Sequence, residues 1–298
     1  MVVRKAVVRR SELADGAWER IAPLLPANGR RGKQWKDHRT VVNGILWKLR
    51  TGAPWRDLPE RYGRTLRLVA DLLRALRPLA ARRDVGPAPG PSADEVRRSG
   101  RGRVGGQRRQ YCRPGASARG RRPPQAGTRR RKKGVEHPED EALGRSRGGL
   151  STKVHLACDG KGRPLSVVVT PGQRHESTQL EAVLDAIRVA RPGVGRPRRR
   201  PERLIADKGY SAPSCRRVLR KRGIAHTIPE RRDQRERRAG RPGRKPGFDA
   251  NAYRRRNVVE RCVNRLKQWR GIATRYEKRA ASYRAMVLIA SLMIWLAP

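Results

Sequence analysis

Two acidic residues stand in otherwise basic surroundings, and their positions suit chemistry on a bound partner. Asp207 ends a short apolar run, a place from which a carboxylate projects off a sheet edge into a crevice. Glu260 belongs to a segment with a helical pattern. Tyr253 and Arg256 lie seven and four residues before it, and Lys267 lies seven residues after it, so that on a helix the four form one stripe. Carboxylates of this type are ligands for hard cations.

Both acidic residues also have structural interpretations. Asp207 can cap a helix or a turn, and Glu260 can form an i,i+4 ion pair with Arg256 on a solvated face. His155 and His175 flank a predicted hairpin. We expect a structural or phosphate-facing role for these histidines, because Asp and Glu are present for a hard cation. The residue types alone leave these alternatives open.

The charge balance indicates a polyanionic partner. The 298 residues contain 73 Lys and Arg against 26 Asp and Glu, which gives a net charge of +47, and nucleic acid is the first candidate for such a partner. No apolar run reaches the roughly 20 residues that span a bilayer, which excludes an integral membrane protein, and residues 285–298 are predicted to form a buried helix. Cys112, Cys158, Cys215 and Cys262 are widely spaced, so we expect a reduced, cytoplasmic protein without structural zinc.

Strands and helices alternate in the C-terminal part of the chain, and they must position Asp207 and Glu260. β-Branched residues on both sides of the glycines at 160 and 162 predict a β-hairpin, and Asp207 follows a short buried strand. The alternation predicts a mixed α/β domain from about residue 134 to the C-terminus. The other expected elements are a helix over 177–190, a helix over 212–222, a strand over 223–229, a long basic loop to 245, and the last helices.

The N-terminal part has helical periodicity. A helix is expected over residues 12–25, and a second begins near Asp37, which suits an N-cap. Together they predict a small helical, DNA-binding-like domain at residues 11–63. Residues 64–133 are rich in Arg, Gly, Pro and Ala, and most of them lack the periodicity of a core. This composition predicts a basic disordered segment between the two structured parts.

The stripe around Glu260 has the spacing Y-(2)-R-(3)-E-(6)-K, which resembles the signature of bacterial insertion-sequence transposases of the DDE type, in the group containing family five. The segments ADKGY, LGRSRGGLSTKVHLACDG and LKQWRGIATRYEK also look like this family. WERIAPLLP and LRTGAPWRDLP resemble its N-terminal helical domain. The resemblance covers roughly residues 11–63 and 134–298, and several separate motifs in the right order argue against a chance match.

The resemblance implies an RNase H-like fold in which two Asp and one Glu hold two divalent metal ions, Mg²⁺ or Mn²⁺. By this resemblance Asp207 is the second Asp and Glu260 is the Glu, both as catalytic and metal-binding residues. The implied partners are double-stranded DNA at the terminal repeats of the element and further copies of the chain in a homo-oligomer, in a nucleoid-associated protein that does not enter a membrane. The implied DNA-binding residues, of which the first two could also orient the Glu, are Arg256, Lys267, Lys208 and Arg270.

One part of the family pattern is absent. The first Asp should lie on the first strand, between residues 64 and 149, in a motif like DST followed by an apolar pair. Residues 109–119 can be encoded by synonymous codons that, when the DNA is read one base later, encode DSTVVRAHQH. This sequence contains that motif. We therefore expect an out-of-frame segment over 64–133, loss of the central first strand, and impaired catalysis. The acids between Arg64 and Glu136, none of them in a strand-like run, are Asp71, Asp84, Asp94 and Glu95.

Two functions follow from these observations. The leading hypothesis is DNA transposition, in which a DDE transposase binds element ends and cleaves and joins strands by two-metal phosphoryl transfer, here in an inactive copy. The alternative is a non-catalytic basic DNA-binding protein. The first requires Asp207 and Glu260 within reach of the same metal ions, whereas the second requires only positive charge.

Overall fold

The computed structural model describes residues 12–25, 37–62, 139–146, 149–190, 195–240, 242–243 and 246–297. The predicted basic segment 64–133 lies outside these residues. Among the described residues, no helix is both long enough and apolar enough to cross a bilayer.

The N-terminal part contains two α-helices, as its periodicity predicts. Helix α1 (Asp15–Ile21) continues into the short 3-10 helix η1 (Ala22–Leu24). Helix α2 (His38–Thr51) begins where the Asp37 side chain accepts a hydrogen bond from the Thr40 amide, which confirms the expected N-cap, and it ends at Gly52 in a left-handed conformation. Two further 3-10 turns, η2 (Trp55–Asp57) and η3 (Glu60–Tyr62), follow.

The first sheet is antiparallel and contains the predicted hairpin. It begins after the 3-10 turn η5 (Glu139–Glu141) and has the order β1-β2-β3, with β1 (Gly144–Ser146), β2 (Gly149–Cys158) and β3 (Pro164–Pro171). β3 pairs with β2 over residues 152–158, whereas β1 pairs only with residues 149–151 at the start of β2. The edge of β2 away from β3 is therefore without a described strand partner over residues 152–158.

The second sheet has two parallel strands and carries Asp207. β4 (Arg203–Ile205) pairs with β5 (Ala225–Thr227), and helix α6 (Pro213–Lys221) connects them. Within the described residues the two sheets share no ladder hydrogen bonds. Both C-terminal ends of a parallel pair meet at one edge, so the chain after β4, which contains Asp207, and the chain after β5 lie at the same edge.

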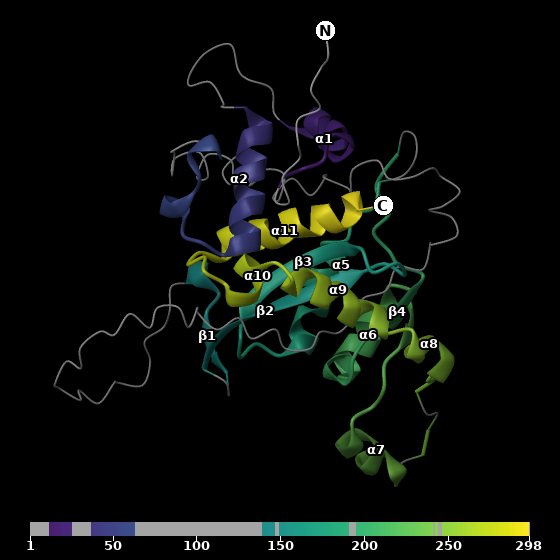
Figure 1. Cartoon of the computed structure of the whole chain (residues 1–298). Helices are drawn as coiled ribbons and strands as arrows, with labels where there is room; N and C mark the ends of the chain where they lie inside the picture. The colour runs from purple at the N-terminus through teal and green to yellow at the C-terminus, as the bar shows by residue number, and fades with distance from the viewer. Residues whose placement is uncertain are drawn as a thin grey trace, which may run out of the picture.

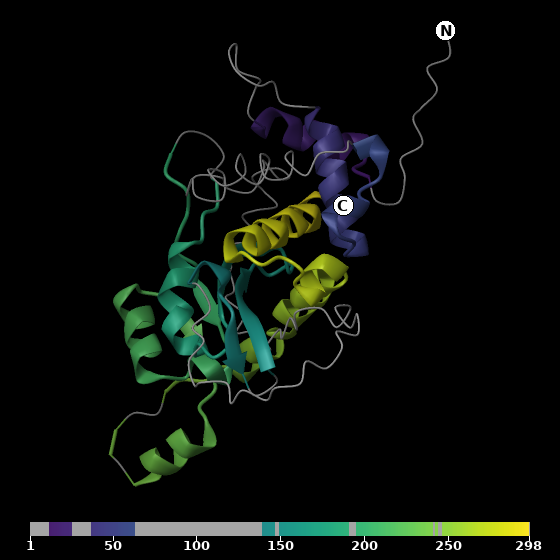
Figure 2. The ribbon, with the colours of Figure 1, turned by 90° about the vertical axis from the view of Figure 1, so that its left-hand side faces the viewer.

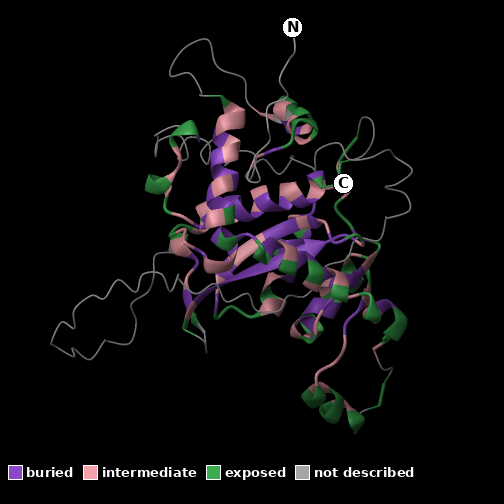
Figure 3. Ribbon diagram, in the orientation of Figure 1, coloured by how far each residue is buried: buried purple, intermediate pink, exposed green. Residues whose placement is uncertain are grey.

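Helices cover both faces of the antiparallel sheet. On one face, alternate residues of β2 and β3 such as Val154 and Val167 pack with α9 (Asn257–Lys267) and α11 (Ala280–Leu296). On the other face, Ala157 packs with α5 (Leu180–Asp185), β4 and α6. Figures 2 and 3 show the resulting layers, with the buried residues concentrated in the sheet and in α11. The mixed α/β architecture predicted from the sequence and the buried C-terminal helix are thereby confirmed.

The N-terminal helices pack directly on the C-terminal part. Apolar residues of α2, including Ile45 and Leu49, belong to the same buried cluster as Tyr283 and Met286 of α11. Helix α2 also contacts α10 (Arg270–Thr274), and Figure 1 shows it standing across α10 and α11. The N-terminal module therefore shares a core with the rest of the described chain.

Two expectations about the last third of the chain are wrong in detail. The basic stretch after β5, expected as a loop, contains helix α7 (Arg232–Ala239), which buries none of its residues and projects from the body in Figure 1. The helix expected to carry the whole Glu260 stripe is split into α8 (Ala250–Arg254) and α9. The amides of Arg255 and Arg256 bond to carbonyls three residues back, and this tighter turn breaks the α-helical ladder.

Candidate functional site

Asp207 lies in a short turn directly after β4. The Ala206 amide still bonds to Thr227 of β5, and the chain then enters the 3-10 turn η7 (Lys208–Tyr210). The Asp207 carboxylate accepts the Lys208 amide at 2.6 Å, so the predicted capping role is present. The side chain is half-buried. Capping occupies one of the two carboxylate oxygens.

Glu260 lies in the first turn of α9, where it pairs with Arg256. The Arg256 guanidinium donates to the Glu260 carboxylate at 2.7 Å, and it also lies 5.5 Å from the centre of the Tyr253 ring. The side chains of Arg256 and Glu260 are 20% and 27% exposed, so the ion pair is partly buried and does not belong to a fully solvated face. The expected i,i+4 pair is thus confirmed, in a position that water only partly reaches.

Tyr253 lies within the electrostatic reach of both acidic residues. Burial raises the pKa of Tyr253, Arg256 opposes this rise, and the charges of Asp207 and Glu260 add to it. The Tyr253 ring lies against the Arg256 guanidinium, which is itself the partner of Glu260.

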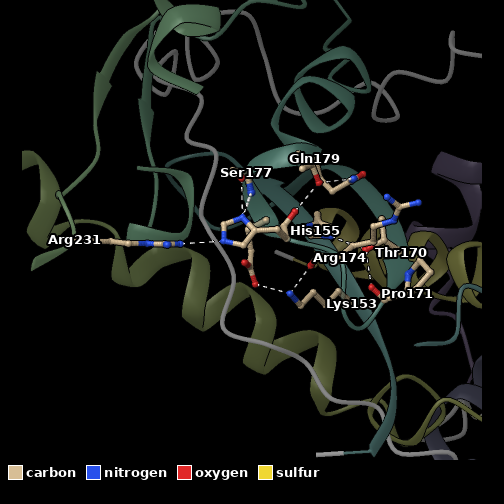
Figure 4. Close-up of polar contacts among 11 residues, drawn as sticks. Lys153, His155, Thr170, Pro171, Arg174, Ser177, Gln179 and Arg231 are labelled. Carbon is tan, nitrogen blue, oxygen red and sulfur yellow. Dashed lines mark hydrogen bonds and ion pairs between the residues drawn. The ribbon is translucent and has the colours of Figure 1, made fainter. Parts of the chain in front are cut away.

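A buried ion pair that the sequence did not indicate joins β2 to the chain that follows β3 (Figure 4). Lys153 on β2 donates to the Glu176 carboxylate at 2.8 Å and to the carbonyl of Arg174 at 2.6 Å, and the two charged side chains are 7% and 14% exposed. Burial alone would raise the pKa of Glu176, but the hydrogen bond from Lys153 leads the effects that bring it below its ordinary value. Glu176 is therefore a carboxylate in the folded protein. A lysine inside an otherwise buried strand was the signal available for finding this pair.

Arg231 makes a second link to the Asp207 turn. Its guanidinium donates to the carbonyl of Lys208 at 3.3 Å and contacts the His175 imidazole at 3.1 Å. The same imidazole contacts the Ser177 hydroxyl at 2.7 Å. His175 therefore contacts both Ser177 and Arg231, and Arg231 in turn contacts the Asp207 turn. These contacts agree with the structural role expected for His175.

His155 is buried beside this ion pair on β2. Its ring nitrogen Nε2 lies 2.8 Å from the Thr170 hydroxyl. Burial lowers the pKa of His155 to about 4, Glu176 opposes this change, and Lys153 adds to it. The imidazole is consequently neutral at pH 7, which again agrees with a structural role.

The predicted DNA-binding residues fall into two groups. Lys208 is exposed in the Asp207 turn, and Arg256 is engaged with Glu260. Lys267 at the end of α9 and Arg270 at the start of α10 are both exposed, but the Arg270 stem lies against Gly52 at the end of α2. Lys208 and Arg256 therefore lie next to the candidate carboxylates, in sequence or by an ion pair, whereas Arg270 lies next to the N-terminal module.

The carboxylates of the described chain do not make up the full set for two cations. No group of three or more His, Cys, Asp or Glu residues that could hold a metal ion occurs among the described residues. Asp207 and Glu260 supply hard oxygen donors of the type that Mg²⁺ and Mn²⁺ accept. Among the described residues, Asp207 and Glu260 are therefore two candidate carboxylate ligands, one of them already paired with Arg256.

Two family models match the chain. The model described as "Transposase DDE domain" matches residues 124–296, and the model described as "Putative transposase of IS4/5 family" matches residues 13–77. The first of these covers more than half of the chain and contains every candidate site residue. The ranges leave residues 78–123 between them.

Curated relatives agree with the family models. The chain is 31% identical over 229 residues, 77% of its length and 94% of the relative's, to the "Putative transposase for insertion sequence element IS402" of Burkholderia cepacia. It is 29% identical over 151 residues, 49% of its length and 99% of the relative's, to the "Putative transposase for insertion sequence element IS6501" of Brucella ovis. No solved structure matches. The motifs, the α/β fold and these matches together show that the chain belongs to the family of insertion-sequence transposases with a DDE domain.

Proposed function

We propose that the chain descends from an active DNA transposase, that Asp207 and Glu260 are two of its three metal-binding carboxylates, and that this copy binds DNA without cleaving it. The observation that carries the proposal is the match of the DDE transposase domain to residues 124–296, which contain both Asp207, directly after β4, and Glu260, in the first turn of α9. The partly buried ion pair with Arg256 supports the proposal, because it fixes the orientation of the Glu260 carboxylate.

The sheet topology supports the loss of a central strand. In an RNase H-like sheet the first strand pairs with the hairpin on one side and with the strand of the second Asp on the other. Here β2 and β4 belong to separate sheets, and the β2 edge that would receive such a strand has no described partner over residues 152–158. A first Asp on that strand would complete the carboxylate set beside Asp207 and Glu260.

A change of reading frame accounts for the loss. The codons permitted for residues 109–119 can encode DSTVVRAHQH one base later, and GC-rich DNA read out of frame yields the Arg, Gly, Pro and Ala that dominate this stretch. The gap between the two family matches, residues 78–123, falls inside the proposed segment 64–133. The N-terminal match reaches residue 77 and so overlaps the first part of the proposed segment 64–133.

The incomplete carboxylate set determines the expected activity. Two divalent ions, when bound, stabilise the attacking and leaving oxygens of an in-line phosphoryl transfer. In this chain, Asp207 and Glu260 would contribute ligand oxygens, and Arg256 would orient Glu260. Because they provide only two carboxylates, no cleavage is expected. DNA binding depends on Lys and Arg contacts to phosphates and does not require the metal.

Partners and location follow from the same proposal. The DNA bound is double-stranded and comes from the terminal repeats of the element, with Lys208, Lys267 and Arg270 as phosphate contacts. The chain acts as a homo-oligomer on DNA in a cytoplasmic, nucleoid-associated form. A non-catalytic basic DNA-binding protein is the alternative, because it requires only positive charge and not the two carboxylates.

Strand cleavage of DNA carrying the ends of the element tests the proposal. The chain as it stands should bind this DNA with a steep salt dependence and release no nicked product in Mg²⁺ or Mn²⁺. A version in which DSTVVRAHQH replaces the segment beginning at Arg109 should cleave, and Asp207→Asn or Glu260→Gln should abolish that cleavage.

Two results would count against the proposal. Nicking by the unrestored chain at the rate of the restored one would mean that another residue supplies the missing ligand. Binding without any cleavage by the restored version would favour the non-catalytic alternative.

A further inference from the structure

Within the described residues, no ladder hydrogen bonds tie the turn that carries Asp207 to the β1-β2-β3 sheet. In a continuous sheet, ladder hydrogen bonds fix each strand end relative to its neighbours. β4 is bonded to β5 on one side, and the described residues contain no ladder between β4 and the β1-β2-β3 sheet. Among the described residues, side-chain contacts connect the Asp207 turn to that sheet.

One such contact runs from β2 through Glu176 to the Asp207 turn. Lys153 holds the Glu176 carboxylate from inside the sheet, and η6 (Glu176–Gln179) packs on η7. A Cβ atom added at Gly209 would lie 3.3 Å from Cβ and 3.5 Å from Cγ of Glu176. The backbone of the turn thus rests directly on the Glu176 side chain, and glycine is the residue that permits this approach.

The same turn is held from a second direction. Arg231, which follows β5, donates to the carbonyl of Lys208. Tyr210, the last residue of η7, is buried and anchors the end of the turn in the core. Contacts from Glu176 to Gly209 and from Arg231 to Lys208 therefore converge on the turn formed by residues 207–210.

We propose that Glu176 is a positioning residue for Asp207. Held by Lys153, Glu176 fixes the 207–210 turn relative to the β1-β2-β3 sheet, and Arg231 is a second support. The inference rests on the proposed function, because it takes Asp207 as a metal ligand. Glu176 does not need to touch the metal or DNA for this role. A buried ion pair suits it because its hydrogen bonds define a direction as well as a distance.

Amide hydrogen exchange in the full chain gives a readout that does not depend on activity. The Tyr210 amide bonds to the Asp207 carbonyl and the Ser211 amide bonds to the Lys208 carbonyl, so both report on the turn itself. Glu176→Gln keeps the shape of the side chain and removes its charge. It should speed exchange at these two amides by roughly tenfold, while the Tyr283 amide in α11 stays as it was and excludes global unfolding.

Mn²⁺ affinity, measured by the electron paramagnetic resonance signal of free Mn²⁺, tests the consequence for Asp207. Loss of a residue that orients a metal ligand weakens binding by roughly 10- to 100-fold, and Glu176→Gln should fall in that range. Glu181→Gln is the matched control, because it removes an exposed glutamate five residues later in the same segment. It should change neither measurement.

The outcomes separate the inference from the function on which it rests. The positioning role would be overturned if Glu176→Gln changed neither the exchange rates of the Tyr210 and Ser211 amides nor the Mn²⁺ affinity by more than about twofold. Should Asp207→Asn leave Mn²⁺ affinity unchanged, the assignment of Asp207 as a ligand would fail. In that case the exchange rates of Tyr210 and Ser211 would still decide whether Glu176 fixes the turn.

Discussion

Two contacts join parts of the chain that are distant in sequence, but by different physical means. One is the contact of α2 with α10, and the other is the buried ion pair of Lys153 and Glu176. At the first contact, an added Cβ at Gly271 would lie 3.3 Å from the Leu49 backbone, so two helices touch through backbone and aliphatic atoms. At the second, Lys153 and Glu176 connect the parts by charge. The first should respond to changes in volume, whereas the second should respond to loss of charge at constant volume.

The largest expected effect comes from removing the lysine of the buried ion pair. Lys153→Met leaves the Glu176 carboxylate buried without its partner, which typically costs about 3–5 kcal/mol of unfolding free energy. Urea denaturation followed by circular dichroism would measure it. Lys153→Met/Glu176→Leu should recover most of the loss, since a buried pair replaced by apolar residues is often neutral. A double variant as unstable as the sum of its single variants would contradict this description of the cluster.

A change of volume at the helix contact should have a slightly smaller effect. Leu49 is 2% exposed and packs in the shared core, so Leu49→Ala should lower the unfolding free energy by about 3 kcal/mol. Val42→Ala, on the partly exposed side of the same helix, is the control and should cost clearly less. Equal losses in the two variants would show that α2 does not bury Leu49 against the C-terminal part.

The pH dependence of stability should reveal His155 in the polar cluster. Its pKa is about 4 in the folded protein against 6.5 ordinarily, so between these values the unfolded chain binds more protons and stability falls as the pH is lowered. A shift of this size corresponds to roughly 3 kcal/mol over the window. Thermal melts from pH 7 to pH 4 would follow it.

His155→Gln should reduce this slope and leave a remainder from His226, whose pKa burial also lowers. His38→Gln, which removes a histidine from α2, serves as the control. An unchanged slope in His155→Gln would mean that the imidazole is not buried in a neutral state.

The smallest effect is expected at an exposed ion pair. Asp15 and Arg39 join α1 to α2, but the Asp15 side chain is 70% exposed, and water screens the attraction. Asp15→Asn should change the unfolding free energy by less than about 0.5 kcal/mol in 0.15 M salt. A loss comparable with that of Leu49→Ala would show that charge also holds the N-terminal module in place.

The elements that were predictable share a local signal. The Asp37 cap, the hairpin and the C-terminal helix each depend on residues close in sequence, and all three occur in the described chain. Helix α7 has no apolar face, so no hydrophobic period distinguished it from a loop. The break between α8 and α9 depends on a local turn geometry that the side-chain pattern does not encode.

The candidate site was predictable only in part, for the same reason. Asp207 and Glu260 lie in short family motifs, which are recognisable in the amino-acid sequence alone. Glu176 and Arg231 act through contacts 23 residues apart in the chain, to Lys153 and to the Lys208 carbonyl respectively. Such pairs are set by the packing of β2, η6 and the Asp207 turn, which a single sequence does not specify.

The central claim is that Asp207 and Glu260 face one another as ligands of the same cation. Anomalous diffraction from crystals of the full chain soaked in Mn²⁺ tests it most directly, because Mn²⁺ is identified by its own signal. We predict a peak with a carboxylate oxygen of Asp207 and one of Glu260 both at about 2.1–2.2 Å, a bond length close to those of Mg²⁺ sites. Carboxylates more than about 12 Å apart, too far to be bridged by ions about 4 Å from one another, or a peak that touches neither residue, would contradict the claim.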